Sequence, residues 1–224
     1  MKLKFGAIVT DGRGKIGGHV ASKNRSGAYL RTKVTPSNPN SVAQAKARGV
    51  LASLSQGWSQ LTDSQRQGWN DAVKEWGTTD IFGDIKNPSG INLFVKLNSN
   101  LLNIGEAIID TVPAKLETPT AYLTAAILTA STGALALSLS DMSADGVVGL
   151  VRSTPMLSSG VSFVKSQFRV IGNNQVTNDV LTVNGAYTTK FGIPTVGSNI
   201  YFSVQLVLAN GQKTVEQKVK ALVV

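Results

Sequence analysis

Few residues in this sequence have types and spacings that could perform chemistry. Glycines at positions 12, 14 and 17 form a G-x-G-x-x-G pattern after the apolar run 5–10, as in a dinucleotide-binding turn. Such a site requires a following helix whose N-terminus faces the pyrophosphate. The polar, glycine-rich stretch 18–27 predicts no helix, and no acid between positions 12 and 62 could bind a ribose hydroxyl. We therefore interpret the pattern as a chance match.

No catalytic or metal-binding constellation is predicted. His19 is the only histidine and cysteine is absent, which argues against a transition-metal site. A general base needs an orienting partner and a nucleophile beside it, and no signature supplies either for His19. The acidic pairs Asp80 with Asp84 and Asp141 with Asp145 lie in turn-like stretches and are interpreted as solvated turns. We expect no enzyme activity and no cofactor.

The charge of the chain is concentrated at its start. The first fifty residues contain ten lysines and arginines and one acid, Asp11, and the remaining residues sum to zero. Such asymmetry points to an interaction with a partner. The candidates for protein-interface or polyanion contacts are Arg13, Lys15, Lys23, Arg25, Arg31 and Lys33.

Short alternating runs broken by glycines predict that residues 1–40 form a basic arm of one or two extended hairpins. Pro36 and Pro39 end it, since proline cannot donate to a strand ladder. An isolated hairpin is marginally stable in water. The arm is therefore expected to be ordered by neighbouring protein chains or by a polyanion.

Residues 41–105 predict a small three-helix region. Two Ser/Thr-x-x-Gln capping boxes, at 41–44 and 62–65, open helices expected to end near Ser55 and near Trp76. Asn87-Pro88 is expected to begin a third helix that ends near Ile104. The predicted core of this region consists of Trp58, Trp69 and Trp76.

A helix-turn-helix interpretation of the first two helices is disfavoured. The second helix carries a net charge of −1 between positions 62 and 76, which does not suit insertion beside DNA phosphates. Any nucleic-acid contact is expected from the arm, through phosphates.

A proline-bearing linker is predicted over residues 106–118, and residues 119–224 then change to a strand pattern. Seven valine- and leucine-rich strands are expected, at 123–129, 134–140, 147–152, 161–171, 175–183, 199–208 and 215–223. Asn210-Gly211 is the strongest hairpin signal. The predicted fold class is α+β, with the arm and helical region followed by an all-β immunoglobulin-like or fibronectin-III-like sandwich.

No apolar run reaches the length of a membrane span, and the N-terminus lacks the long apolar stretch of a secretory signal. The sequence alone thus leads us to expect a soluble protein made in a cytoplasm, without a membrane partner.

Several motifs together resemble a family of small proteins from tailed bacteriophages and prophages. These motifs are the Gly14–Gly18 run, Arg31-Thr-Lys, the Pro36–Ser41 stretch with Gln44 and Arg48, and the spaced tryptophans 58 and 69. Proteins of that family join such an N-terminal region to an Ig-like domain. The resemblance implies a virion structural protein of the head, neck or tail, made in the bacterial cytoplasm, and it implies no catalytic residues.

Two functions follow as hypotheses. In the first, the chain is a virion subunit whose arm adds strands to copies of itself or to other virion proteins, in a homo-oligomer. In the second, the arm binds DNA phosphates and the protein coats nucleic acid. The two hypotheses differ in their expected dependence on salt.

Overall fold

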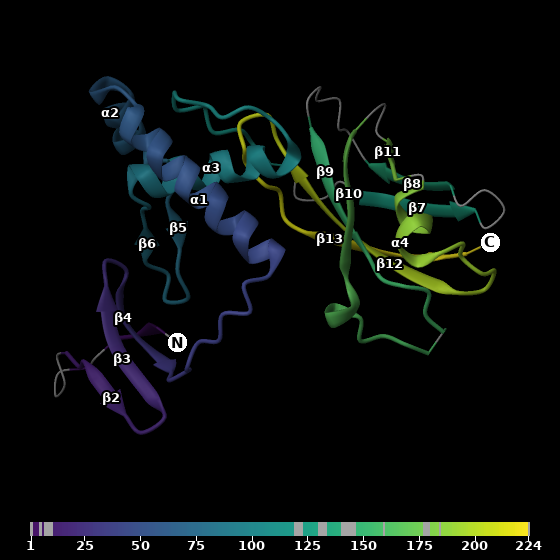
Figure 1. The fold of residues 1–224 in the computed structure, drawn as a ribbon, viewed down its shortest axis with the longest axis horizontal. Coiled ribbons are helices and arrows are strands. Elements are labelled where there is room, and N and C mark those ends of the chain that lie inside the picture. Colours follow the sequence, from purple (N-terminus) through teal and green to yellow (C-terminus); the bar gives the residue numbers. More distant parts are fainter. Residues whose placement is uncertain are drawn as a thin grey trace. The chain divides into compact units, whose positions relative to one another are not determined.

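The computed structural model describes residues 2–4, 6, 11–118, 123–129, 134–139, 147–158, 160–176, 180–183 and 185–223. The apolar run 5–10, apart from Gly6, and the pair Asp141 with Asp145 lie outside these residues. The fold is α+β, with helices and antiparallel sheets, as predicted (Figure 1). The chain divides into two compact units, residues 1–49 with 77–87, and residues 50–76 with 88–224.

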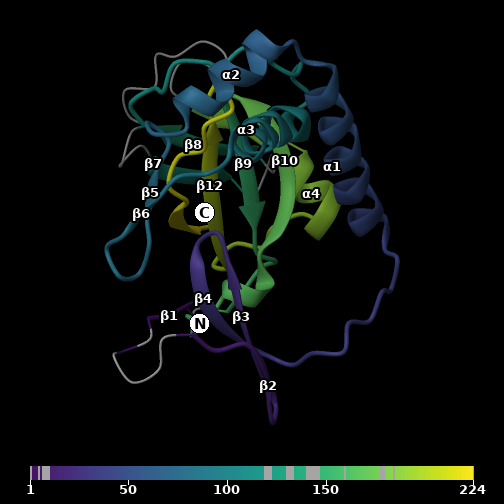
Figure 2. The same ribbon diagram turned by 90° about the vertical axis from the view of Figure 1, so that its left-hand side faces the viewer.

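The first unit contains two small sheets. One has the strand order β1-β4-β3-β2, formed by β1 (Lys2–Leu3), β2 (Gly14–Ile16), β3 (His19–Asn24) and β4 (Gly27–Thr32) (Figure 2). The other pairs β5 (Thr78–Thr79) with β6 (Ile85–Lys86), a stretch for which only turns were expected.

The predicted capping boxes are present. Helix α1 (Val42–Gln60) follows Ser41, whose backbone N–H and side chain exchange hydrogen bonds with Gln44. Helix α2 (Asp63–Ala72) follows Thr62, which accepts from the backbone of Gln65 at 3.3 Å. Helix α1 continues past the expected end at Ser55. The reason is that Leu54 and Leu61 are buried in the helical core, and this packing outweighs the roughly 1 kcal/mol cost of Gly57 in a helix.

Helix α3 (Gly90–Ile104) starts after Ser89, and Gly105 ends it in the left-handed conformation with φ +89°. Gly90 lies against α2, because a Cβ there would be 2.3 Å from the side-chain oxygen of Asn70. Only glycine permits the two helices to approach this closely at that point. The core of this helical cluster consists of Leu54, Leu61, Trp69, Trp76, Leu93, Phe94 and Leu97.

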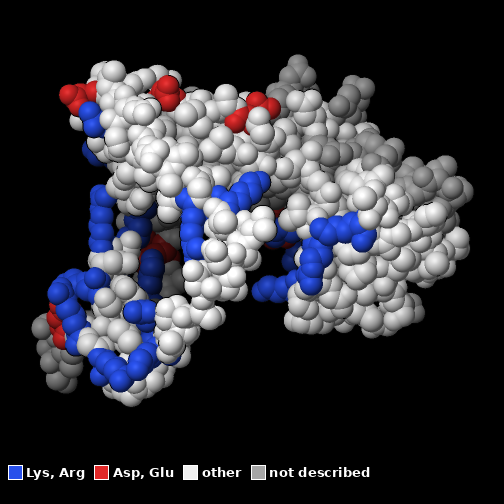
Figure 3. Space-filling view, viewed as in Figure 1, with Lys and Arg blue, Asp and Glu red and all other residues white. Residues whose placement is uncertain are grey.

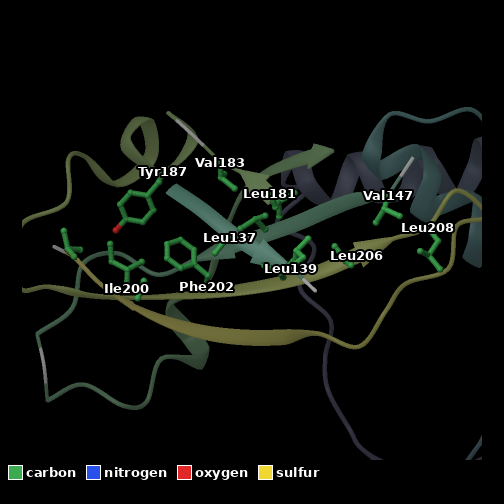
Figure 4. Packing of buried hydrophobic residues seen from close by; sticks show 14 residues of the cluster. Leu137, Leu139, Val147, Leu181, Val183, Tyr187, Ile200, Phe202, Leu206 and Leu208 are labelled. Atoms are coloured by element: carbon green, nitrogen blue, oxygen red, sulfur yellow. The ribbon is translucent and has the colours of Figure 1, made fainter. Parts of the chain in front are cut away.

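Two antiparallel sheets form the C-terminal part of the second unit. One has the order β11-β8-β7 and the other β10-β9-β12-β13. Their strands are β7 (Leu123–Thr129), β8 (Ala134–Leu139), β9 (Val148–Ser153), β10 (Arg169–Gln175), β11 (Val180–Thr182), β12 (Asn199–Val207) and β13 (Gln217–Leu222). Apolar residues from both sheets meet in one core (Figure 4). We call this part the double sheet.

Three local predictions in the double sheet need correction. The expected strand 161–171 is a turn with a 3-10 helix, η1 (Lys165–Gln167), and β10 then begins at Arg169. The strand expected over 175–183 is reduced to β11 in the described residues. A short helix, α4 (Ala186–Phe191), follows it and was not predicted, because its six residues carry no capping signal and pack through the buried Tyr187.

The predicted linker 106–118 forms hydrogen bonds with the turn that connects β12 to β13. Leu116 exchanges two backbone-to-side-chain hydrogen bonds with Gln212, at 2.6 and 3.1 Å. The Asn210 amide donates to the Ala114 carbonyl at 2.9 Å. The helical cluster, residues 106–118 and the double sheet belong to one compact unit.

Candidate assembly interface

The four-stranded N-terminal sheet contains almost no core of its own. Among its described side chains only Ala21 is buried, and Ile16 is 70% exposed. Within the described residues, no strand pairs with the outer edge of β2 or of β1. Unpaired strand edges expose backbone donors and acceptors that can bind another chain. The sheet thus has the features of a surface that a partner completes.

The pairing register gives this sheet two different faces. Gly14 is opposite Ala21, and Ala21 is opposite Leu30, so these residues share one face, together with Ile16. Lys15 is opposite Val20, and Val20 is opposite Arg31, which places both cations on the other face. The first face combines these residues with His19, Lys23 and Thr32, whereas the second face carries Lys15 and Arg31.

The structure separates the six predicted contact residues into two groups. The Nε atom of Arg13 and the Nζ atom of Lys23 each lie 3.8 Å from a carboxylate oxygen of Asp11. In the described part of the chain, the other four side chains have no acidic partner and are exposed: Lys15, Arg25, Arg31 and Lys33. Figure 3 shows the resulting group of basic side chains at the lower left of the view. Positive charge is therefore left available on this sheet.

The acids of the β5–β6 hairpin bind strand β1. Lys2 Nζ lies 3.4 Å from Asp80, and Lys4 Nζ lies 2.9 Å from Asp84 and 5.3 Å from the centroid of the Phe82 ring. The pair Asp80 and Asp84 was predicted to be solvated, but the Asp80 side chain is only 4% exposed. This hairpin therefore neutralises the lysines at the start of the arm.

Asp80 also closes the hairpin turn. Its Oδ1 accepts from the backbone N–H groups of Phe82 at 2.8 Å and of Asp84 at 3.1 Å. Burial by itself would raise the pKa of Asp80, but these two N–H donors and the Lys2 ammonium outweigh it and hold the pKa below its ordinary value of 3.8.

The Pro36–Ser41 motif and Arg48 form one local structure at the start of α1. The Arg48 guanidinium donates to Asn38 Oδ1 at 2.7 Å and to Asn40 Oδ1 at 3.4 Å. Asn40 has a φ of +48°, in the region that asparagine tolerates better than most residues. These contacts fix the point at which the chain leaves the N-terminal sheet and enters the helix.

The three tryptophans have different environments. Trp69 is fully buried, packs edge-on against Phe94 at 5.4 Å between ring centroids, and donates from Nε1 to the Asp110 carbonyl at 2.8 Å. Trp76 is 6% exposed, and its Nε1 has no hydrogen-bond partner among the described atoms. Trp58 is half-buried against Phe94.

The other predicted chemical motifs do not form a site. Gly14 lies in β2 and Gly17 in the turn to β3, so a strand follows the glycines where a dinucleotide site needs a helix. His19 is exposed on β3, opposite Thr32. In the described ranges there is no group of three or more residues able to hold a metal ion.

None of the helices in the part of the chain that the structure covers has the length and apolarity needed to cross a membrane. Comparison of the sequence and the structure with known proteins gave no matching protein family, no matching curated protein and no matching solved structure.

Proposed function

We propose that the chain is a structural subunit of a tailed-phage virion, in the head, neck or tail, and that it assembles through its basic N-terminal sheet. The sheet adds its edge strands to copies of the same chain or to other virion proteins, in a homo-oligomer. The observation that carries the proposal is a paired sheet whose edge strands have no further partner among the described residues, and in which Ala21 is the one described side chain that is buried. Such a sheet gains most of its stability from a partner.

The double sheet of this subunit is proposed to be an immunoglobulin-type sandwich. Lettered in chain order as A, B, C, C′, E, F and G, the seven described strands β7 to β13 pair as A-B-E and C′-C-F-G. This arrangement of letters is the one that Greek-key connections produce in immunoglobulin-related folds. In a virion, such a domain would supply a rigid body that the N-terminal sheet attaches to its neighbours.

A second candidate function is binding of DNA by the same N-terminal sheet. It is favoured by the four cations without an acidic partner in the described structure, Lys15, Arg25, Arg31 and Lys33. Affinity that rests on phosphate contacts falls steeply with salt concentration. Each contact contributes a slope of about −0.9 to the plot of log affinity against log salt concentration. Strand addition rests on backbone hydrogen bonds and apolar contacts, which salt screens far less.

Hydrogen exchange measured on residues 14–33 separates these functions. The isolated subunit and the assembled particle are compared at low and high salt, with the amides of α3 as an internal reference. Protection of residues 14–33 that appears on assembly and persists at high salt supports the structural role. Protection that requires DNA and disappears with salt would contradict it and favour DNA binding.

A further inference from the structure

A groove of about 440 Å³ lies on the outer face of the sheet β10-β9-β12-β13, within the second unit. Tyr201 forms part of it, while its neighbours Ile200 and Phe202 face the core and are fully buried. The walls of the groove are the segment 162–168 and strand β13. The aromatic and basic residues that line the groove are Phe163, Lys165, Phe168, Tyr201, Lys218 and Lys220.

The segment that forms one wall is held in place. The Tyr201 hydroxyl donates to the Val161 carbonyl at 3.2 Å, and Val164 is buried at 9% exposure. The Gln167 N–H donates to the Val164 carbonyl at 2.9 Å and so closes the turn of η1. The groove is therefore shaped before any ligand binds, which lowers the entropy cost of binding.

The charge of this face is positive. Lys218 and Lys220 are exposed on β13 and lie two residues apart, so they project from the same face. The only carboxylate among the described residues of the double sheet is Glu216, which accepts from Ser203 and lies 3.8 Å from Arg152. None of the described residues that line the groove is acidic. Figure 3 shows this second group of basic side chains over the double sheet.

The aromatic rings of the groove differ in whether their faces are free to stack on a ligand. The Lys218 ammonium lies over the Phe168 ring, 5.5 Å from its centroid, and so occupies one face of that ring. Phe163 is 76% exposed and makes no ring contact in the described structure. A large exposed aromatic side chain beside lysines is the combination that binds a flat ring attached to an anionic chain.

We propose that this groove binds a single strand of nucleic acid. One base stacks on Phe163, and successive phosphates are bound by Lys218 and Lys220. Alternate residues on a strand are about 7 Å apart, which is close to the spacing of successive phosphates in an extended single strand. A base in a duplex is already stacked and paired, whereas a single strand offers its bases freely to an aromatic side chain. The proposal is independent of the role of the N-terminal sheet.

Fluorescence anisotropy of the full chain with a short labelled oligothymidylate tests the proposal. Phe163→Ala is expected to weaken binding by about 5- to 150-fold, whereas Phe163→Trp retains it. Lys218→Ala is expected to reduce the salt slope by about 0.7. The matched controls are Ile193→Ala, at an exposed apolar residue of the double sheet, and Lys96→Ala, at an exposed lysine of α3. Equal effects of the groove variants and their controls would overturn the proposal.

Two further measurements locate the binding and identify its chemistry. Crosslinks from a 5-bromouracil oligonucleotide should map to residues 161–168, and crosslinks confined to residues 13–33 would overturn the proposal in favour of the N-terminal sheet. Polyglutamate or alginate should displace the oligonucleotide much less well than unlabelled oligothymidylate at the same charge. Equal displacement would show an unspecific polyanion surface and would also overturn it.

Discussion

The amide of Asn100 donates a hydrogen bond to the carbonyl of Gly211 at 2.8 Å, although 111 positions separate the two residues in the sequence. The bond is buried and joins α3 to the hairpin between β12 and β13. At the same place the backbone of Leu97 packs directly on Gly211, since a Cβ built on Gly211 would be 2.6 Å from the Leu97 carbonyl oxygen. The helical cluster and the double sheet are thus joined by backbone contact.

We expect Gly211→Ala to lower the free energy of unfolding by about 3 kcal/mol or more. The φ of +80° is a strained conformation for alanine, and the clash with Leu97 would also separate Gly211 from the Asn100 amide. Gly197→Ala is the matched control, because Gly197 has a φ of +83° with nothing within 4 Å of its Cβ position. Gly197→Ala should lower the free energy of unfolding only by the backbone strain of a positive φ, about 1–2 kcal/mol. Equal losses in denaturant titrations would contradict the proposed backbone contact.

The features that could be predicted from the sequence are those fixed by neighbouring residues. The Thr62–Gln65 capping box and the left-handed Gly105 involve groups within one or two helical turns, so the sequence pattern alone specifies them. The run 123–129 is a strand over the whole of its predicted range. Its content of leucine, isoleucine and threonine, which favours a strand, is likewise a local property.

The features that could not be predicted depend on distant residues. No local pattern shows that Gly211 lies on α3, because the contact requires both folded elements. The placement of Lys15 and Arg31 on one face of the N-terminal sheet follows from a pairing register that the turns at Gly17 and at Arg25-Ser26 fix. The groove beside Phe163 could not be predicted, because the residue pattern of 161–168 favours a strand and the hydrogen bond from the Tyr201 hydroxyl to Val161 joins residues 40 positions apart.

Trp69→Ala is expected to lower the free energy of unfolding by about 3–5 kcal/mol, as for other buried large aromatics. The substitution removes a fully buried side chain and leaves the Asp110 carbonyl without its donor. Trp58→Ala is the comparison, since Trp58 packs on the same Phe94 ring but is only half-buried. Thermal or denaturant unfolding should show a clearly smaller loss for Trp58→Ala. Similar losses of stability in the two variants would mean that the burial of the tryptophan does not determine how much its removal destabilises the protein.

Tyr187→Phe is expected to leave the protein unchanged or to stabilise it by about 1–2 kcal/mol. The ring is fully buried in the double sheet (Figure 4), and within the described structure its hydroxyl has no hydrogen-bond partner. Tyr201→Phe is the matched control, because that hydroxyl donates to Val161, and its removal should cost about 1 kcal/mol. A loss of stability in Tyr187→Phe would show that the hydroxyl is bonded, for example to a buried water.

The same tyrosine predicts a pH effect. Burial raises the pKa of Tyr187 to about 12, above its ordinary value of 10.0. The unfolded chain therefore ionises first, so the contribution of this group to stability is complete below pH 10 and declines as the pH rises from about 10 to about 12. The free energy of unfolding of the native protein should fall more steeply across this interval than that of Tyr187→Phe. Parallel curves for the two proteins would contradict the raised pKa.

Asp80 predicts the opposite dependence at acid pH. Its pKa in the folded chain lies below the ordinary value of 3.8, so the unfolded chain takes up the proton first as the pH falls. The stabilisation from Asp80 is therefore present above about pH 3.8 and is lost as the pH falls through the folded pKa. Amide exchange of residues 78–86 and of β1, corrected for the intrinsic rate, should show that protection declines in this acid range.

Asp80→Asn separates the charge of this side chain from its role in the turn. The amide oxygen can still accept from the Phe82 N–H, but it cannot bind the Lys2 ammonium as an ion pair. The variant should keep the β5–β6 turn, lose protection at β1 already at neutral pH, and lack most of the acid-dependent decline. Asp84→Asn is the control, since the Asp84 side chain pairs with Lys4 at a more exposed position, 41% against 4% for Asp80. Because exposed ion pairs contribute little, it should change the protection of β1 much less. An equal change in both variants would show that total charge, and not the buried contact between Lys2 and Asp80, attaches the start of the chain to this hairpin.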